Sequence, residues 1–431
     1  MASPKLRFKE FDGDWIKVDI QTLVDEKILD KPMDGNHGEI HPVSADYVEN
    51  GIPFVMATDV IDGKVHLEKS KKIRKSQADS LRKGFSLEGD ILLTHKATIG
   101  NVAKVPELET PYVMLTPQVT YYRVLNKEKL DPDFIKSTFE APIFQNELLA
   151  LCTGATRLYI GISEQRKLPF SYPSKEEQTK IASFLSAVDE KIAQLTQKHE
   201  LLSQYKQGMM QKLFSQQIRF KADDWSEFGE WEKLKFADSF NFYQTNSYSR
   251  ALLSEVGEIM NIHYGDIHTK FSTLFDVSKE VVPFINGEVD TSKISSEQYL
   301  RVGDLVIADA SEDYKDIGKT IEVIHLDNSK VVAGLHTYIA RPIKQCAMGF
   351  NGYLMQTFEV REQIKTLATG ISVLGISKTN LGKVELKIPC LEEQTKIANF
   401  LFAIDQKIEK VAQQIEETKQ WKKGLLQQMF V

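Results

Sequence analysis

Three short patterns in the chain have residue types that could bind a nucleotide or a metal ion. Residues 318–320, Gly-Lys-Thr, resemble the end of a phosphate-binding loop, but Asp313 stands where that loop needs its first glycine. The cradle of backbone N–H groups is then incomplete, so the pattern does not predict nucleotide binding. His37 and His41 have the spacing of zinc ligands on a helix, but the glycines and the proline around them predict a loop. An acidic run over residues 309–316 is more typical of a solvated loop than of a cation site.

The motifs of methyl transfer and of nuclease chemistry are missing. None of the fourteen prolines is next to another, which excludes the Asn/Asp-Pro-Pro-aromatic loop that holds a flipped base in amino-methyltransferases. No glycine-rich cofactor loop follows a first strand. Glu385 and Lys387 could end a nuclease motif, but no Pro-Asp pair lies suitably upstream. The sequence therefore predicts a chain with no catalytic centre, no metal site and no cofactor of its own.

The composition is ordinary for a globular protein. The 431 residues suit two to four domains, with 42% hydrophobic and 26% charged residues. No run approaches the roughly 18 apolar residues of a membrane helix, and the first residues lack the apolar core of a signal peptide. The three cysteines are far apart and odd in number, which predicts neither a disulfide framework nor a metal-binding pair. We therefore expect a reducing cytoplasm and no membrane.

The net charge of −6 does not by itself indicate nucleic-acid binding, but the basic residues are clustered. Residues 64–83 contain eight Lys and Arg against only Glu68 and Asp79. Such a patch could follow phosphates. A solvated surface explains it equally well at this point.

An internal repeat organises the whole chain. Residues 176–192 return as residues 392–408 with thirteen of seventeen positions identical, at an offset of 216. The same offset relates residues 205–214 to residues 421–430. Residues 20–150 and 240–365 scarcely align. Each copy thus has a constant half and a divergent half, which indicates two different ligands of one kind.

The constant half is predicted to be a long helix with a heptad pattern. Its apolar positions follow a 4-3 spacing, which favours pairing of the two helices as an antiparallel coiled coil. The predicted helix-pairing residues are Ile181, Leu185, Val188, Ile192, Leu195, Ile397, Leu401, Ile404, Ile408 and Val411.

The divergent halves are predicted to be mixed α+β domains. Strands are expected at residues 89–94, 119–124, 305–308 and 336–340, and short helices at residues 133–140 and 350–358. The predicted division is a first divergent domain at 1–175, a first helix at 176–215, a second divergent domain at 216–391 and a second helix at 392–431.

This layout resembles the specificity subunit of type I restriction-modification systems. The duplicated Glu-Glu-Gln-Thr-Lys-Ile-Ala-x-Phe-Leu helix carries the resemblance, together with residues 89–100 and residues 34–38. The likeness covers essentially the whole chain. The second domain departs from the pattern, because residues 303–311 continue into an acidic stretch without the Ile-Gly turn of the first copy.

The resemblance implies a non-catalytic, cytoplasmic DNA-binding protein. Each variable domain would read one half of a split target in double-stranded DNA. The helices would space the two readers and dock two methyltransferase subunits. Motor-nuclease restriction subunits would join for cleavage. S-adenosylmethionine, ATP and Mg would be bound by those partners. Two alternatives remain: the recognition subunit of a combined cleavage-methylation system, and a coiled-coil scaffold that binds only proteins.

Base reading needs polar side chains on loops, and phosphate binding needs basic ones. For each residue below, the alternative is an ordinary surface turn. The DNA-binding candidates in the first domain are Asn36, His37, Lys69, Lys71, Lys72, Arg74, Lys75, Thr94, His95, Lys96, Thr98, Thr156 and Arg157. Those in the second domain are Tyr243, Asn246, Arg250, Ser311, Tyr314, Lys315 and Ser372.

Overall fold

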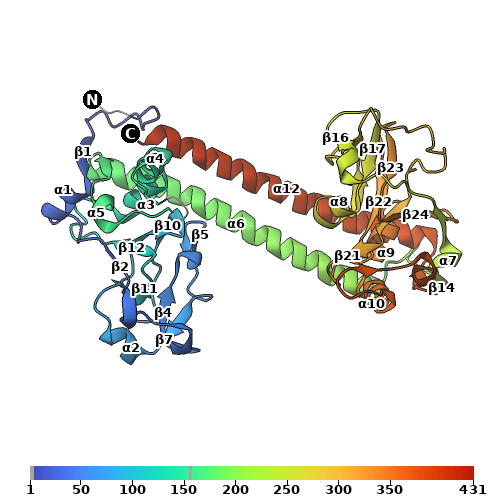
Figure 1. The fold of residues 1–431 in the computed structure, drawn as a ribbon, viewed down its shortest axis with the longest axis horizontal. Coiled ribbons are helices and arrows are strands. Elements are labelled where there is room, and N and C mark those ends of the chain that lie inside the picture. The colour runs from blue at the N-terminus through green and yellow to red at the C-terminus, as the bar shows by residue number, and fades with distance from the viewer. Residues whose placement is uncertain (1–3, 155–157) are drawn as a thin grey trace. The chain divides into compact units, whose positions relative to one another are not determined.

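The computed structural model describes residues 4–154 and 158–431, and its chain divides into two compact units (Figure 1). Unit 1 combines Met1–Gln197 with Ala412–Val431, and unit 2 is Lys198–Val411. The division falls inside the two long helices, α6 (Lys175–Phe214) and α12 (Leu391–Met429), so each unit contains a part of both. Among the helices of the described residues, none combines the length and hydrophobicity of a membrane span.

Unit 1 is built on two sheets. The strand order of the first sheet is β10-β9-β12-β2, all antiparallel, and that of the second is β3-β7-β4-β11-β8, with β4 and β11 parallel. The strands of the first sheet are β10 (Thr98–Lys104), β9 (Ile91–Lys96), β12 (Val119–Tyr122) and β2 (Met33–Asp34). Those of the second are β3 (Tyr47–Val48), β7 (Lys71–Ile73), β4 (Ile52–Val55), β11 (Val113–Leu115) and β8 (Phe85–Ser86). Helices α3 (Pro132–Glu140) and α4 (Pro142–Ala150) contribute to the core beside β9 and β12.

Unit 2 repeats this plan with other residues. The strand orders are β15-β24-β20-β22-β18 and β16-β19-β17-β23. The first sheet contains β15 (Phe240–Tyr243), β24 (Thr337–Pro342), β20 (Leu305–Ala308), β22 (Thr320–His325) and β18 (Leu274–Asp276). The second contains β16 (Leu253–Ser254), β19 (Phe284–Ile285), β17 (Ile259–Ile262) and β23 (Lys330–Ala333). Helix α9 (Phe350–Met355) takes the place of α3, and α10 (Phe358–Leu367) follows it. The sequence-based predictions of strands in β9, β12, β20 and β24, and of helices in α3 and α9, are confirmed.

Two pairs of salt bridges recur in both units and hold the same elements together. Arg7 forms a bidentate pair with Glu177 near the start of α6, and Arg219 forms the same pair with Glu393 near the start of α12. Within the sheets, Arg123 binds both carboxylate oxygens of Asp90, and Arg341 binds both of Asp304. Bidentate pairing fixes orientation as well as distance. The Arg7 and Arg219 pairs therefore hold segments outside the sheets against the long helices, and the Arg123 and Arg341 pairs hold neighbouring strands together.

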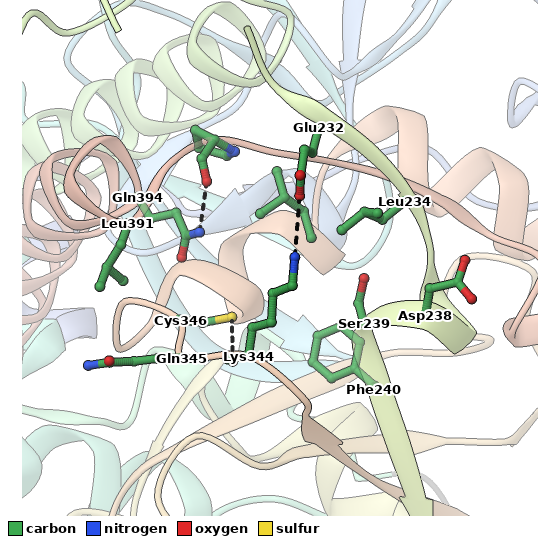
Figure 2. Close-up of a pocket in the computed structure, with 12 residues that line it drawn as sticks. Glu232, Leu234, Asp238, Ser239, Phe240, Lys344, Gln345, Cys346, Leu391 and Gln394 are labelled. Carbon is green, nitrogen blue, oxygen red and sulfur yellow. Dashed lines mark hydrogen bonds and ion pairs between the residues drawn. The ribbon is translucent and has the colours of Figure 1, made fainter. Parts of the chain in front are cut away.

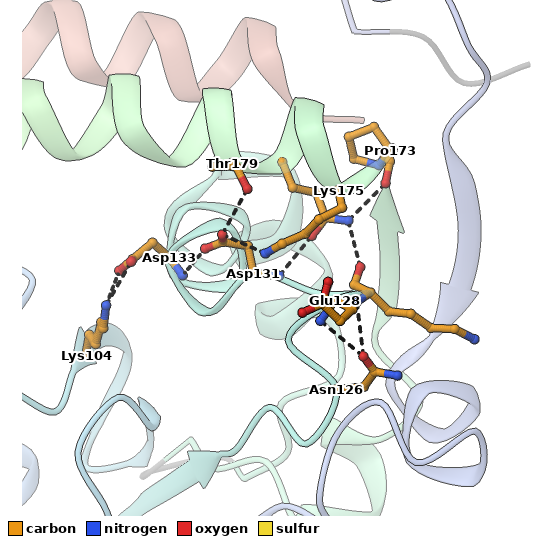
Figure 3. A network of polar contacts seen from close by, with 10 residues as sticks. Lys104, Asn126, Glu128, Asp131, Asp133, Pro173, Lys175 and Thr179 are labelled. Carbon is orange, nitrogen blue, oxygen red and sulfur yellow. Dashed lines mark hydrogen bonds and ion pairs between the residues drawn. The ribbon is translucent and has the colours of Figure 1, made fainter.

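A polar network fixes the start of α6 (Figure 3). Asp131 accepts hydrogen bonds from Lys175 Nζ at 2.8 Å and from Thr179 Oγ1 at 3.3 Å. The Gln178 side chain accepts from the backbone N–H of Asp131 and donates to the carbonyls of Lys129 and Pro173. In unit 2, Gln394 forms the equivalent bonds with Ala347 and Pro389.

In each unit, the start of one long helix shares a core with the end of the other. Unit 1 buries Ile181, Leu185 and Val188 in the same cluster as Leu425, Leu426, Met429 and Phe430. Unit 2 buries Ile397, Leu401 and Ile404 with Leu213 and Phe214. Ile192 and Ile408 are partly buried against these cores, and Leu195 and Val411 are buried. Within each unit, segments of the two long helices thus pack into one core.

Candidate nucleic-acid interface

The tip of the β9–β10 hairpin presents two of the predicted side chains. Strand β9 is buried up to His95, and the chain reverses at Ala97, which has a positive φ of 70°. Lys96 pairs with Thr98 across this turn, and both side chains are exposed. A bulge follows between Ile99 and Val102, at the point where β10 is twisted away from β9. The hairpin therefore holds one cation and one hydroxyl at the end of a buried sheet.

A second loop is braced against this hairpin. Thr153 and Tyr159 exchange two backbone hydrogen bonds of 2.9 Å, which close the loop between them. Tyr159 also pairs with Lys96, and the N–H of Ile160 donates to the carbonyl of His95. Of the predicted residues in this loop, Thr156 and Arg157 lie outside the described residues.

A buried polar cluster lies beneath the hairpin and corrects three of the predictions. Thr94 and His95 are buried, and so is Asn36, whose side chain donates to the carbonyl of Lys83 and accepts from the N–H of Arg82. Thr94 accepts from the N–H of Asn101, at 3.0 Å. These polar atoms already have partners and are shielded from solvent, so in this structure the three side chains brace the loops and are not exposed for contact with a base.

The electrostatics of this cluster follow from burial. Burial alone would raise the pKa of Asp34, but hydrogen bonds from Lys83 and His37 lower it. Burial lowers the pKa of His95 to about 4, although the nearby Asp34 carboxylate opposes this. The His95 ring shares a hydrogen bond of 2.8 Å with Thr120 Oγ1. Only His37 reaches solvent among the predicted residues of the cluster, with 56% of its side chain exposed.

The predicted basic patch lies on β7 and on α2 (Lys75–Ser80). Lys69, Lys71, Arg74 and Lys75 are exposed and Lys72 is half-buried. Within the part of the chain that the structure describes, only Lys75 among these five forms an ion pair, with Asp79 at 2.6 Å. The other four cations are available to phosphates, whose contacts position DNA without reading its sequence.

The predicted residues of unit 2 divide in the same way. Arg250, Tyr314, Lys315 and Ser372 are exposed. Ser311 is buried and accepts from the N–H of Asp313, so it is corrected to a turn residue. Asn246 is half-buried and bonded to Asn261, and Tyr243 lies under the Arg341 guanidinium at 4.3 Å. Arg250 also binds the buried carboxylate of Asp266, so part of the Arg250 charge is already neutralised.

The patterns that could have carried nucleotide or metal chemistry have structural partners. Lys319 Nζ donates to the carbonyl of His268, and Asp313 accepts from the N–H of Lys315 in the following turn. In the described residues, no three His, Cys, Asp or Glu side chains converge as metal ligands would.

A pocket of about 190 Å³ lies elsewhere in unit 2 (Figure 2). It is lined by residues of β14 (Glu232–Lys235), by Lys344 to Cys346 and by the first residues of α12. Gln178 accepts from the N–H of Asp131 and Gln394 from the N–H of Ala347, so the preceding residues, Leu130 and Cys346, are counterparts. Leu130 is fully buried, and the smaller Cys346 side chain lines the pocket at the equivalent place. None of the predicted DNA-binding residues lines this pocket, which therefore stands apart from the loop surface.

Loops of each unit converge beyond one end of its first sheet. This arrangement, two similar α+β units with matched frames and unmatched loops, defines a class of paired recognition modules. The chain belongs to the family of the type I restriction modification DNA specificity domain, whose model matches residues 37–204 and 231–420. The prediction of a specificity subunit, in place of a methyltransferase or nuclease, is confirmed by this family.

Named relatives extend over nearly the full chain. The type I restriction enzyme MjaVIII specificity subunit of Methanocaldococcus jannaschii is 26% identical over 425 residues, which are 94% of this chain and 88% of the relative. A second specificity subunit of that organism, assigned to the MjaX enzyme, is 24% identical over 86% of this chain and 84% of its own. The crystal structure of the type I restriction-modification system S subunit from M. genitalium has a TM-score of 0.56 and 17% identity, covering 100% of this chain and 99% of that one. This last likeness concerns the fold.

Proposed function

We propose that this chain reads a bipartite DNA target, with one half-site for each unit. The observation that carries the proposal is the loop pair that both units build on the same frame. The hairpin at Lys96 and the loop closed by Thr153 and Tyr159 have counterparts at residues 309–311 and in the loop closed by Thr369 and Gly375. The frames match while the exposed residues differ, which suits two readers of different sequences.

The long helices are proposed to form a coiled coil that sets the gap between the two half-sites and docks two methyltransferase subunits. Motor-nuclease subunits would join them for cleavage. In this assembly the partners supply S-adenosylmethionine, ATP and Mg. Helix α6 has 40 residues and is about 60 Å long at 1.5 Å per residue. That length is enough to separate two binding sites on DNA.

Exchange of one recognition domain tests the proposal. Replacing residues 20–150 with the matching segment of a relative should change one half of the methylated sequence and leave the other half and the gap intact. Methylome sequencing of cells that carry the parent or the exchanged gene, together with the methyltransferase gene, gives the readout. A simultaneous change in both halves would contradict independent reading.

DNA binding by purified protein separates the alternative functions. Because the net charge is −6 and one basic patch stands out, we expect weak, salt-sensitive binding by the chain alone and specific binding with a methyltransferase subunit. Tight specific binding by the isolated chain at physiological salt would contradict this. A scaffold that binds only proteins would show no sequence discrimination in either state. A partner that carries both nuclease and methyltransferase in one polypeptide would identify the combined cleavage-methylation system.

A further inference from the structure

A tightly closed loop in unit 2 carries two exposed aliphatic side chains. Thr369 and Gly375 exchange backbone hydrogen bonds of 2.9 and 2.7 Å, which close the loop between them. Gly370 has a φ of 131°, and a Cβ there would lie 2.0 Å from the carbonyl oxygen of Val373. Backbone hydrogen bonds and the close turn at Gly370 thus hold the two ends of the loop together.

The exposure of the side chains changes sharply between the tip of this loop and its end. Ile371 is 101% exposed and Val373 is 56% exposed, whereas Leu374 is 2% exposed and belongs to the core of unit 2. Single exposed aliphatic residues are common on proteins. Two on one loop, with a single serine between them, make a small apolar tip that a ligand could cover.

The position of the loop points to the ligand. Strand β25 (Leu374–Gly375) pairs with β21 (Ala310–Ser311), and the N–H of Ile376 donates to the carbonyl of Asp309. In unit 1 the N–H of Ile160 makes the same bond to His95, beside the exposed Lys96. The apolar tip therefore belongs to the loop surface of unit 2, close to the segment that presents Tyr314 and Lys315.

The two units differ in the chemistry of this loop. By the offset of 216, Ile371 and Val373 correspond to Ala155 and Arg157, which lie outside the described residues. One copy thus has an arginine where the other has a valine. Beside the loop of unit 2, the segment with Asp309, Glu312 and Asp313 adds negative charge, which disfavours a phosphate contact at this place.

We propose that Ile371 and Val373 read thymine through its 5-methyl group in the major groove. This inference rests on the proposed function of unit 2. The methyl group is the one apolar feature on the edge of a base pair in that groove, and aliphatic side chains recognise it by contact. A loop closed by its own backbone hydrogen bonds fits this role because it loses less conformational freedom on binding. Ser372 lies between the two side chains and offers a hydroxyl to a neighbouring base edge.

Uracil tests the proposal, because it is thymine without the methyl group. The full chain is combined with its methyltransferase subunit and bound to a duplex that has the target sequence identified by methylome sequencing. Each thymine of the half-site read by unit 2 is then replaced by uracil. We expect at least one replacement to weaken binding about fourfold, which is the scale for one buried methyl group. In the double variant Ile371→Ala and Val373→Ala this loss should disappear.

Two controls make the result specific. Ile343→Ala removes a half-exposed isoleucine of unit 2 outside this loop and should keep the full sensitivity to uracil. Uracil in the half-site of unit 1 should act equally on the parent and on the double variant. Because the loop is closed by backbone bonds, the double variant should also keep the hydrogen exchange of the parent in β20 and β24.

Several outcomes would overturn the proposal. One is a unit 2 half-site without any A·T pair. Another is a uracil effect that persists in the double variant. A third is a rise in 2-aminopurine fluorescence on binding, because it would show that the two side chains insert between bases and unstack them. If the parent complex fails to distinguish its target from a scrambled duplex, the proposed function itself fails. If it distinguishes them but ignores uracil, only the inference about thymine fails.

Discussion

At the scale of residues, buried polar groups support the exposed ones. His95 and Asp34 occupy the base of the hairpin whose tip exposes Lys96 and Thr98. Burial keeps His95 neutral, with a pKa of about 4. The exposed side chains of the tip therefore rest on buried polar groups, which is how a scaffold fixes the geometry of a surface.

The buried histidine gives the protein a pH dependence of known sign. An unfolded histidine has a pKa of about 6.5. Between pH about 6.5 and 4 the unfolded chain binds a proton that folded His95 does not, so stability falls as pH falls through this window. At pH 5 the loss is about 2 kcal/mol relative to pH 7.5. In urea unfolding at the two pH values, His95→Asn should remove that difference. An unchanged pH dependence in the variant would contradict the prediction.

The basic patch should act on affinity and leave specificity intact. Lys71 is exposed and has no ion pair among the described residues. If it neutralises one phosphate, Lys71→Gln lowers the slope of log Kd against log salt by about 0.9. The measurement uses the methyltransferase complex and its target between about 50 and 200 mM salt. Lys127→Gln, an exposed lysine on another loop, is the control and should leave the slope unchanged.

At the scale of elements, a lysine breaks the apolar pattern of each long helix at matching positions. Lys422 of α12 binds Glu140 and Asp189, each at 2.6 Å, and Lys136 binds the same two carboxylates at 2.7 and 2.9 Å. In unit 2, Lys206 of α6 binds Asp405, which also accepts from the Tyr353 hydroxyl. These contacts join the long helices to each other and to the short helices α3 and α9, through charges that only one alignment can pair.

Removal of this lysine should be costly. Lys422→Ala leaves Glu140 and Asp189 with one cation between them, in a site where Lys422 is 16% exposed. We expect a loss of about 2 kcal/mol in the free energy of unfolding of unit 1. Lys419→Ala breaks an exposed pair with Glu416 and should cost less than about 1 kcal/mol. Thermal denaturation compares the two, and equal losses would contradict a special role for Lys422.

The elements were predictable from the sequence, whereas the burial of particular side chains was not. Helix periodicity and the alternation of strands are local properties, so the long helices and β9, β12, β20 and β24 could be located. Thr94 and His95 are polar and stand at the end of a strand, which predicted exposure. They are buried because β9 lies between β10 and β12, a long-range arrangement. The apolar tip of Ile371 and Val373 was missed because base readers were sought among polar residues, although the repeated Thr-Gly pair marked the loop.

At the scale of the whole molecule, helix length is the quantity that the proposed spacing depends on. A heptad added after Leu195 and another after Val411 preserve the 4-3 pattern, so the chain should still fold. Each helix lengthens by roughly 10 Å, which corresponds to about three base pairs. We expect the same half-sequences with a longer gap and reduced activity, as read by methylome mapping. A heptad added to one helix alone is the control and should disrupt folding. An unchanged gap at full activity would show that the helices do not set it.

Paired aromatic residues test the independence of the two units. Phe430 packs on Trp15 and Phe134, at 6.3 and 5.6 Å between ring centroids, and Phe214 packs on Trp231 and Phe350 at 6.2 and 5.7 Å. Truncation of a buried phenylalanine to alanine costs about 3–5 kcal/mol. Phe430→Ala should accelerate hydrogen exchange in unit 1, and Phe214→Ala should do so in unit 2. Acceleration of both units by either change would show that they unfold together.

Unit 1 is assembled from the two ends of the chain, and this affects the order in which the two units fold during synthesis. Unit 2 is one continuous segment and can fold once residue 411 has emerged. Unit 1 begins the chain, yet its core includes Leu425, Leu426, Met429 and Phe430. At about 5–20 residues per second, its first sheet waits for tens of seconds with part of its apolar surface uncovered. The domain that is made first is therefore completed last, and a message cut short near its end yields a folded unit 2 beside an unfinished unit 1.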